Sequence, residues 1–73
     1  MHVSPNPARD YFFVETDMRD AVLTVTDAEG RLVQKLEIRN QKAEIRCSGW
    51  ARGVYFVTVR NKESEKRVKV VVE

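Results

Sequence analysis

The sequence predicts a single, small all-β domain, and three observations support this. The chain has 73 residues, fewer than the roughly 100–200 of a typical domain, so it allows one folding unit. No stretch of about eleven residues keeps its apolar side chains at helical spacing. Short segments rich in β-branched or aromatic residues alternate instead between apolar and polar positions. Six strands are predicted: Tyr11–Glu15, Ala21–Thr26, Leu32–Ile38, Lys42–Cys47, Val54–Arg60 and Lys66–Val72.

The first predicted strand follows a stiff segment with two prolines. Pro5 and Pro7 fix their own backbone φ, and each favours an extended conformation in the residue before it. We expect this segment to deliver the strand at a set angle. We expect residues 1–3 to be a linker end or foreign to the domain, so that the domain spans residues 4–73.

The second and third strands are predicted to form an antiparallel hairpin. Between them stand Asp27, Ala28, Glu29 and Gly30, which fit a type I turn closed by a glycine in the left-handed conformation. A similar polar connector, residues 61–64, predicts that the fifth and sixth strands are also antiparallel neighbours.

Alternation assigns faces to the later strands. Ala43, Ile45 and Cys47 alternate with charged residues, which predicts a half-exposed strand. The fifth strand is apolar on both faces, with Tyr55, Val57 and Val59 on one and Val54, Phe56 and Thr58 on the other. This pattern is typical of a central strand. The connector before it contains Trp50, which we expect to cover one end of the core.

The last strand is predicted to point its alternate valines, Val68, Val70 and Val72, into the core. Its opposite face carries Arg67, Lys69 and Val71. Lysine at such a position discourages edge-to-edge aggregation. If the edge of this strand were nevertheless unprotected, a homodimer of the isolated domain is a further expectation.

Charge and composition argue against several classes of function. The formal net charge is only +2, with both signs interspersed, which does not favour nucleic-acid binding. No apolar run approaches the roughly 20 residues of a membrane helix, and no signal peptide is evident. The single cysteine, Cys47, has no partner for an internal disulfide and is interpreted as a small core residue.

Catalytic and metal sites are not predicted either. His2 is the only histidine and lies at a chain end, and one histidine with one cysteine does not make a zinc site. The three glycines lie in β connections with no helix to follow, unlike a phosphate-binding loop. Loop carboxylates are interpreted as solvated, not calcium-binding; they are Asp17, Asp20, Asp27 and Glu29. We therefore expect a non-enzymatic domain without metal or cofactor.

Four short motifs in a fixed order resemble the C-terminal sorting domain of the type IX secretion system, type A, also called the Por secretion C-terminal domain. The motifs are Pro5-Asn6-Pro7 before the apolar Phe12 and Val14, then Val25, Asp27 and Gly30 with Leu32 and Val33, then Gly53-Val54-Tyr55 with Val57 and Val59, and finally Lys66, Val68, Lys69 and Val70. The resemblance covers residues 4–72. Two positions depart from the family pattern, since Ser4 stands where an aromatic residue is common and Trp50 lies in a loop that often contains leucine and proline.

This resemblance implies an immunoglobulin-like antiparallel β-sandwich of about seven short strands, one more than the pattern alone predicts. It also implies a non-catalytic signal that directs a cargo protein across the outer membrane. In the family, a shuttle receptor recognises the folded domain at the outer membrane, a translocon exports it and a sortase usually removes it with surface anchoring. The implied route leads through the periplasm to the cell surface or to secretion.

Recognition is expected on the last two strands, with the terminal strand offering backbone groups for β-augmentation and its basic residues attracting an acidic partner. The candidate residues are Gly53, Tyr55, Lys66, Arg67, Val68, Lys69 and Val70, together with Pro5, Asn6 and Pro7 of the first motif and Asp27 and Gly30 of the hairpin. For each of them a purely structural role is an equally good interpretation.

An immunoglobulin-like adhesion or carbohydrate-binding module remains the alternative. It predicts that Trp50, Tyr11 and Phe13 lie exposed on one flat face, where aromatic rings stack on sugars. Buried rings would favour the sorting signal. A third class, a barrel that binds single-stranded nucleic acid, predicts strongly salt-dependent binding, which we do not expect.

Overall fold

The computed structural model describes residues 1–73 and contains seven β-strands and no helix. The strands are β1 (His2–Ser4), β2 (Tyr11–Glu15), β3 (Ala21–Asp27), β4 (Leu32–Ile38), β5 (Lys42–Arg46), β6 (Gly53–Arg60) and β7 (Glu65–Val72). They form a three-stranded sheet of order β1-β2-β5 and a four-stranded sheet of order β4-β3-β6-β7. All strand pairs are antiparallel. None of the chain has the helical length and apolar character needed to span a bilayer.

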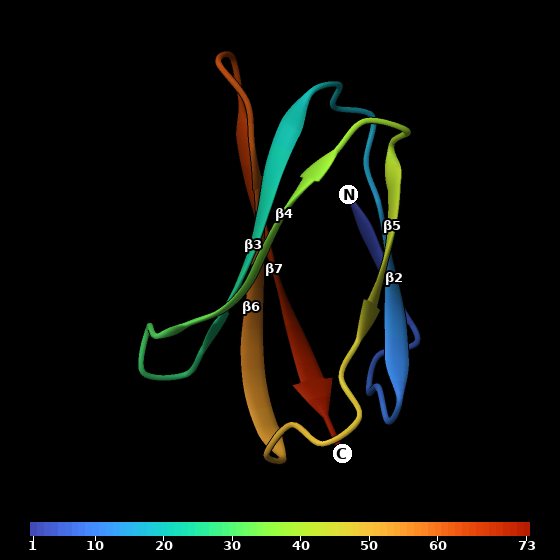
Figure 1. Cartoon of the computed structure of the whole chain (residues 1–73), viewed down its shortest axis with the longest axis vertical. Coiled ribbons are helices and arrows are strands. Elements are labelled where there is room, and N and C mark those ends of the chain that lie inside the picture. Colours follow the sequence, from blue (N-terminus) through green and yellow to red (C-terminus); the bar gives the residue numbers. More distant parts are fainter.

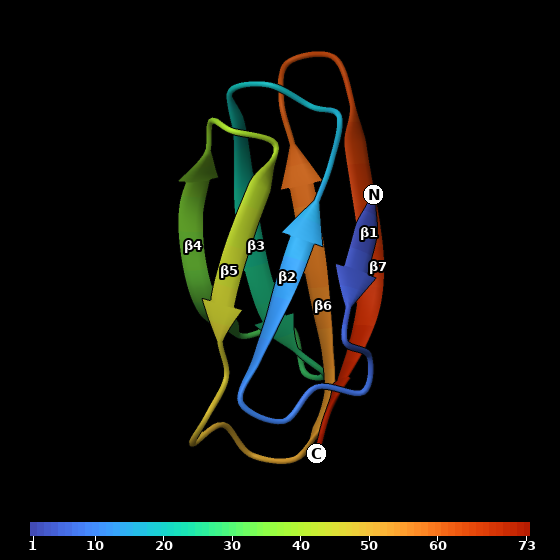
Figure 2. The ribbon, with the colours of Figure 1, turned by 90° about the vertical axis from the view of Figure 1, so that its right-hand side faces the viewer.

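The two sheets stack face to face (Figures 1 and 2), which is the immunoglobulin-like sandwich expected from the sequence. Each of the six predicted strands is present, and no boundary differs by more than one residue. The seventh strand is β1, which pairs with β2 through Val3 and Val14. Val3 is buried, so the expected domain boundary at Ser4 falls inside a strand of the sandwich. Three residues are too few to show alternation, and β1 therefore leaves no pattern in the sequence.

The core fills the space between the sheets with one face of each sheet. The three-stranded sheet supplies Phe12, Val14 and Ile45, and the four-stranded sheet supplies Leu23, Val25, Ile38, Val57, Val59 and Val70, all with no more than 1% of their surface exposed. Cys47 is buried beside them as predicted. Its Sγ donates to the Arg9 carbonyl at 3.5 Å, and burial raises the pKa of this thiol, which keeps it uncharged.

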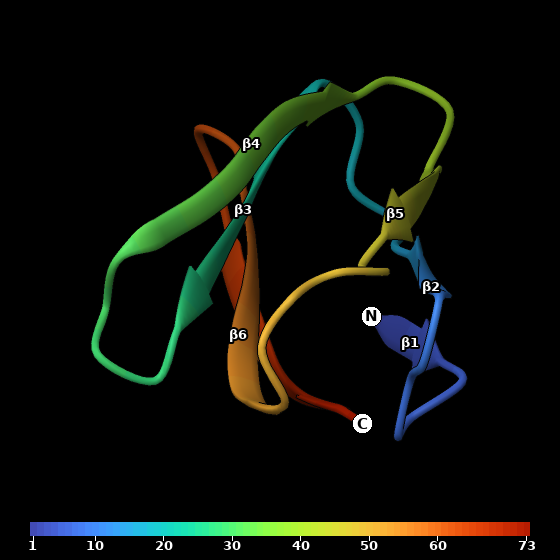
Figure 3. The ribbon, with the colours of Figure 1, turned by 60° about the horizontal axis from the view of Figure 1, so that its bottom comes forward.

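The connections lie at the two ends of the sandwich. The segment between β5 and β6 crosses from one sheet to the other at one end (Figure 3), and Trp50 in this segment packs on the core cluster. The Trp50 ring lies 5.1 Å from that of Tyr55 and 6.3 Å from that of Phe12. Trp50 thus covers one end of the core, as expected.

Candidate functional site

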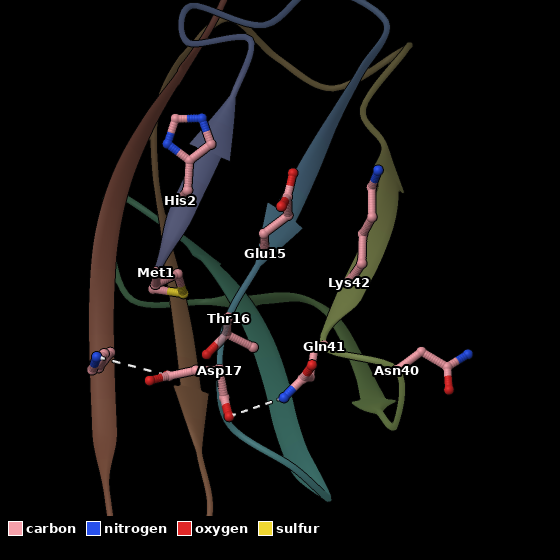
Figure 4. A pocket seen from close by; sticks show the side chains of 9 residues that line it. Met1, His2, Glu15, Thr16, Asp17, Asn40, Gln41 and Lys42 are labelled. Carbon is pink, nitrogen blue, oxygen red and sulfur yellow. Dashed lines mark hydrogen bonds and ion pairs between the residues drawn. The ribbon is translucent and has the colours of Figure 1, made fainter.

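One hollow of 620 Å³ lies at the end of the sandwich where β2 ends and β5 begins (Figure 4). Its lining mixes lysines, carboxylates, amides and the side chain of His2. The only ion pair in it joins Lys66 Nζ to an Asp17 carboxylate oxygen at 3.9 Å. No three side chains with metal-binding groups gather here or elsewhere in the chain. This lining has no arrangement typical of a particular reaction, and the predicted recognition residues lie mostly elsewhere, on β6, on β7 and in the segment before β2.

Gly53 and Tyr55 hold the start of β6 in place. Gly53 has a φ of +149°, a backbone conformation that residues with a side chain rarely adopt, so this position requires glycine. The Tyr55 hydroxyl donates a 2.6 Å hydrogen bond to the Ala51 carbonyl, and the side chain is 6% exposed. A tyrosine that bonds back to the preceding loop is a known corner device of immunoglobulin-like sandwiches. These two residues therefore position the start of β6.

Asp27 and Gly30 close the β3–β4 hairpin. The Asp27 carboxylate accepts 2.9 Å hydrogen bonds from the backbone N–H groups of Glu29 and Arg31, and one from Arg31 Nε. Gly30 has a φ of +86°, the left-handed conformation expected at this turn. The hydrogen bond from the Arg31 N–H is the main cause that lowers the pKa of Asp27 from its usual value, with smaller contributions from Glu29 and the Arg31 guanidinium. This pair of residues is likewise a folding element of the hairpin.

Strand β7 separates the basic residues that the sequence places together. Lys66 points to the side of the inner sheet face, where it pairs with Asp17. Arg67 and Lys69 lie on the opposite, outer face and form no ion pair within the chain. The Arg67 guanidinium lies 4.4 Å from the centre of the Phe56 ring on neighbouring β6. Val70 and Val72 are buried and Val68 is half-buried, as alternation predicted.

The segment that precedes β2 reaches the outer edge of β7, the edge that faces away from β6. The Asn6 side chain accepts a hydrogen bond from the Val71 N–H and donates one to the Lys69 carbonyl, both at 3.0 Å. The backbone of Ala8 continues this contact, since its N–H donates to the Val71 carbonyl and its carbonyl accepts from the Glu73 N–H, both at 2.8 Å. Residues 6–8 thus take the place that a further strand would occupy.

The other half of the same edge is open. Backbone groups alternate in direction along an antiparallel strand, so those of Arg67 point the same way as those of Val71. No group of the chain pairs with them, and the same holds for the Lys69 N–H. Backbone groups that could bond a partner strand are therefore free from residue 65 to the N–H of Lys69. From the carbonyl of Lys69 to residue 73 they are already bonded within the chain.

Sequence reasoning identified the motif Pro5-Asn6-Pro7 but missed what it contacts. Its members were interpreted as a stiff lead-in, whereas Asn6 and the fully buried Ala8 bind the terminal strand. The sequence feature that could have indicated this contact is an asparagine between two prolines. The prolines offer no N–H to a neighbouring strand, while the asparagine side chain has both a donor and an acceptor, like a peptide group.

The aromatic residues do not form one exposed platform. Tyr11 and Phe13 lie on the outer face of the three-stranded sheet, with ring centres 5.3 Å apart and an edge-to-face angle of 72°. Trp50 packs instead against Tyr55 and Phe12 at the end of the core. A flat sugar-binding surface made of all three rings, which the alternative interpretation requires, is thus not present.

Three comparisons with known proteins place the chain. A family model described as "Secretion system C-terminal sorting domain" matches residues 2–73. No curated protein matches the chain. Among solved structures, the chain is similar to PorZ of Porphyromonas gingivalis, described as an essential bacterial surface component of the type IX secretion system, with 25% identity and a TM-score of 0.88. The match covers 99% of this chain but only 11% of that one, so it concerns a single domain of a much longer protein.

Proposed function

Because the chain belongs to the family of type IX secretion system C-terminal sorting domains, we propose that it acts as the export signal of a cargo protein to which it is attached. The family match over residues 2–73 is the observation that carries this proposal. A folded signal requires a stable surface and no catalytic centre. Placement of the sorting motifs on a rigid sandwich is consistent with that requirement.

The proposed partners are an outer-membrane shuttle receptor, a translocon and a sortase. The receptor binds the folded domain after the cargo has entered the periplasm, the translocon passes the cargo across the outer membrane, and the sortase removes the domain while the cargo is anchored at the cell surface. An acidic receptor surface suits this domain, because Arg67 and Lys69 lie exposed and without an ion-pair partner beside the open part of the β7 edge.

In this proposal some motif residues maintain the fold and others contact the partner. Asp27 and Gly30 close the β3–β4 hairpin, Gly53 and Tyr55 position the start of β6, and Asn6 holds β7 from its outer edge. Among the candidate recognition residues, Arg67 and Lys69 lie exposed on the outer sheet face without an ion-pair partner, and they are the ones proposed for direct contact. The N-terminal motif and the terminal strand act as one unit, although more than 60 residues separate them along the chain.

A fusion experiment tests this function. Residues 1–73 are joined to the C-terminus of a periplasmic reporter in a host with type IX secretion, beside a copy that ends at Arg60 and therefore lacks β7. We expect the reporter at the cell surface only with the full domain. A full fusion that is folded, shown by protease resistance, and yet stays in the periplasm would contradict the proposed function.

A further inference from the structure

The outer face of the four-stranded sheet is uncovered, although its composition resembles that of a surface in contact with a partner. No element of the chain lies over it (Figure 1). On β3 and at residues 54–58 of β6 this face carries only β-branched and aromatic side chains, and Val71 near the end of β7 adds one more. Each is half-buried by its neighbours: Val22, Thr24, Thr26, Val54, Phe56, Thr58 and Val71. Leu32, 60% exposed, lies opposite Thr26 and extends this surface onto β4.

The outer face of the three-stranded sheet provides an internal control. It is equally open to solvent, and its eight positions are His2, Ser4, Tyr11, Phe13, Glu15, Lys42, Glu44 and Arg46. Four of these carry full charges, two of each sign, so this face is mixed and neutral overall. An antiparallel sheet that meets only water normally has such a polar outer face. The two central strands of the four-stranded sheet, β3 and β6, depart from that rule, because Arg60 at the end of β6 is the only charged residue that they place on the outer face between Val22 and Thr26 of β3 and Val54 and Arg60 of β6.

The charges around the uncovered apolar face indicate the charge of its partner. Lys35 on β4 lies opposite Thr24, while Arg67 on β7 lies opposite Thr58, so cations border the central strip from both sides. Lys69 adds a third cation beside Phe56. None of the three has an acidic partner within the chain. The acidic residues of this face, Glu37 and Glu65, are paired with Arg39 and Arg60 at one end of it.

We infer that the whole outer face of the four-stranded sheet, from β4 to β7, is a docking surface for an acidic protein that presents apolar side chains between carboxylates. The inference rests on the proposed function and extends the contact from the terminal strand to Phe56, Thr58 and Lys35. The apolar strip supplies buried area, and the bordering cations orient the partner and exclude basic surfaces. Phe56, which is central and lies beneath Arg67, is the expected main contact.

The chain offers a matched pair of aromatics for the test. Phe56 lies on one outer face with the Arg67 guanidinium 4.4 Å from its ring centre, and Phe13 lies on the other with Lys42 Nζ at 4.9 Å. Both side chains are half-buried. Phe56→Ser and Phe13→Ser are made in the reporter fusion, with Lys35→Glu and Lys42→Glu as the corresponding pair of exposed charge reversals. Thermal melts of the isolated domains show that each variant is folded.

We expect Phe56→Ser and Lys35→Glu to lower surface export by about tenfold or more, as for a central contact residue, while their partners on the other face change it less than about twofold. The charge reversals keep the test valid if a serine variant unfolds, because Lys35 and Lys42 are both exposed. If the unaltered fusion is exported and the variants of the two faces are exported equally, this inference alone is overturned. Failure of the unaltered fusion overturns the proposed function as well.

A second measurement distinguishes a protein partner from a membrane. The 73-residue domain is sedimented with vesicles of zwitterionic phospholipid containing about one-third anionic phospholipid, at physiological ionic strength. We expect it to remain in the supernatant. Sedimentation that is lost in Lys35→Glu and kept in Lys42→Glu would assign this face to an anionic membrane surface and overturn the choice of a protein partner.

Discussion

The two faces of β7 differ in what they contact, although their residues alternate along one strand. The inner face carries Val70 and Val72, which are buried between the sheets. The outer face carries Arg67 and Lys69, which contact no acidic group. A motif that reads as one basic and apolar string in the sequence is therefore two sets of side chains, one that builds the fold and one that remains available to a partner.

The edge of β7 shows a second division of the same kind. Its half next to Val71 is bonded by Asn6 and Ala8, while its half next to Arg67 is open. Natural sheets protect their edges because unpaired backbone groups recruit other strands. Here the protection comes from the N-terminal motif, which limits both self-association through β7 and the length of any partner strand that could add to it.

The largest effect is expected when the same negative charge is placed on each face of β7 in turn, which tests whether one face is buried and the other exposed. Val70→Asp buries a carboxylate that is fully enclosed, at a cost of at least about 4 kcal/mol, comparable to the whole stability of a chain this size. We expect this variant to be unfolded by circular dichroism. Val71→Asp, one residue away on the outer face, should fold with a loss of about 1 kcal/mol. Equal stabilities of the two variants would contradict the assignment of faces.

Asn6→Ala tests the support of β7 from its edge. The substitution removes two hydrogen bonds and leaves the Val71 N–H and the Lys69 carbonyl without a protein partner, so urea unfolding should show a loss of about 1–3 kcal/mol. Amide exchange at Val71 should quicken more than at Val70. Asn40→Ala, an exposed asparagine at a loop, serves as the control and should change neither quantity. An unchanged exchange rate at Val71 in the Asn6 variant would show that the contact does not stabilise the strand.

Tyr55→Phe tests whether the hydrogen bond between Tyr55 and Ala51, at the start of β6, stabilises the fold. It removes only the hydroxyl that bonds the Ala51 carbonyl, and we expect a loss of about 0.5–1.5 kcal/mol in the free energy of unfolding. Tyr11→Phe removes a hydroxyl from the only exposed tyrosine and should have no measurable effect. Similar losses in both variants would mean that the corner bond carries no stability of its own.

Arg67→Ala should have a smaller effect on folding, because it removes a contact with Phe56 that is open to solvent. The expected loss is about 0.5 kcal/mol in chemical denaturation, at the low end for an exposed cation–π pair. Lys42→Ala, which removes the similar contact with Phe13, should match it. If Arg67→Ala were as destabilising as Asn6→Ala, the outer face would be a folding element and the contrast between the faces would fail.

Lowering the pH should not change the difference in stability between variants of the two faces of β7. The carboxylate with a lowered pKa is Asp27, which lies in the β3–β4 hairpin. A carboxyl group with a folded-state pKa below its unfolded value stabilises the fold above the unfolded value, and this stabilisation is lost as pH falls through the folded one. Asp27→Asn should therefore lower stability at neutral pH, and by a smaller amount at an acid pH where the carboxyl group of the folded domain is protonated. Urea unfolding at both pH values measures this, and a pH-independent difference between Asp27→Asn and the unaltered domain would contradict it.

The sequence was sufficient to predict the strands and faces of this fold because alternation is a local property. The six predicted strands and the inward positions Val70 and Val72 of the last one follow from side-chain order alone, whereas the order did not decide which of the two apolar faces of β6 is buried. The short β1 was not predicted from the pattern, since three residues carry no period. Contacts between distant segments were also missed, and the binding of Asn6 to β7 is the main example.

The candidate site was predicted less completely for a related reason. The candidate recognition residues include Arg67 and Lys69, which lie on the surface, but also Gly53 and Tyr55, which a backbone angle and an internal hydrogen bond explain. Phe56 was assigned to the second face of a central strand, but sequence alone did not show that this face is uncovered. Only the arrangement of both sheets reveals which apolar face lacks a partner.

The most direct test of the account reverses charge on each face of β7 in the exported fusion. Arg67→Glu combined with Lys69→Glu changes the outer face, and Lys66→Glu, directly before Arg67 in the sequence, changes the side that faces Asp17. With all proteins shown to be folded, we predict that the reporter disappears from the cell surface in the double variant and remains there in the Lys66 variant. Full export of the double variant would contradict the proposal that the export machinery binds the outer face of the terminal strand.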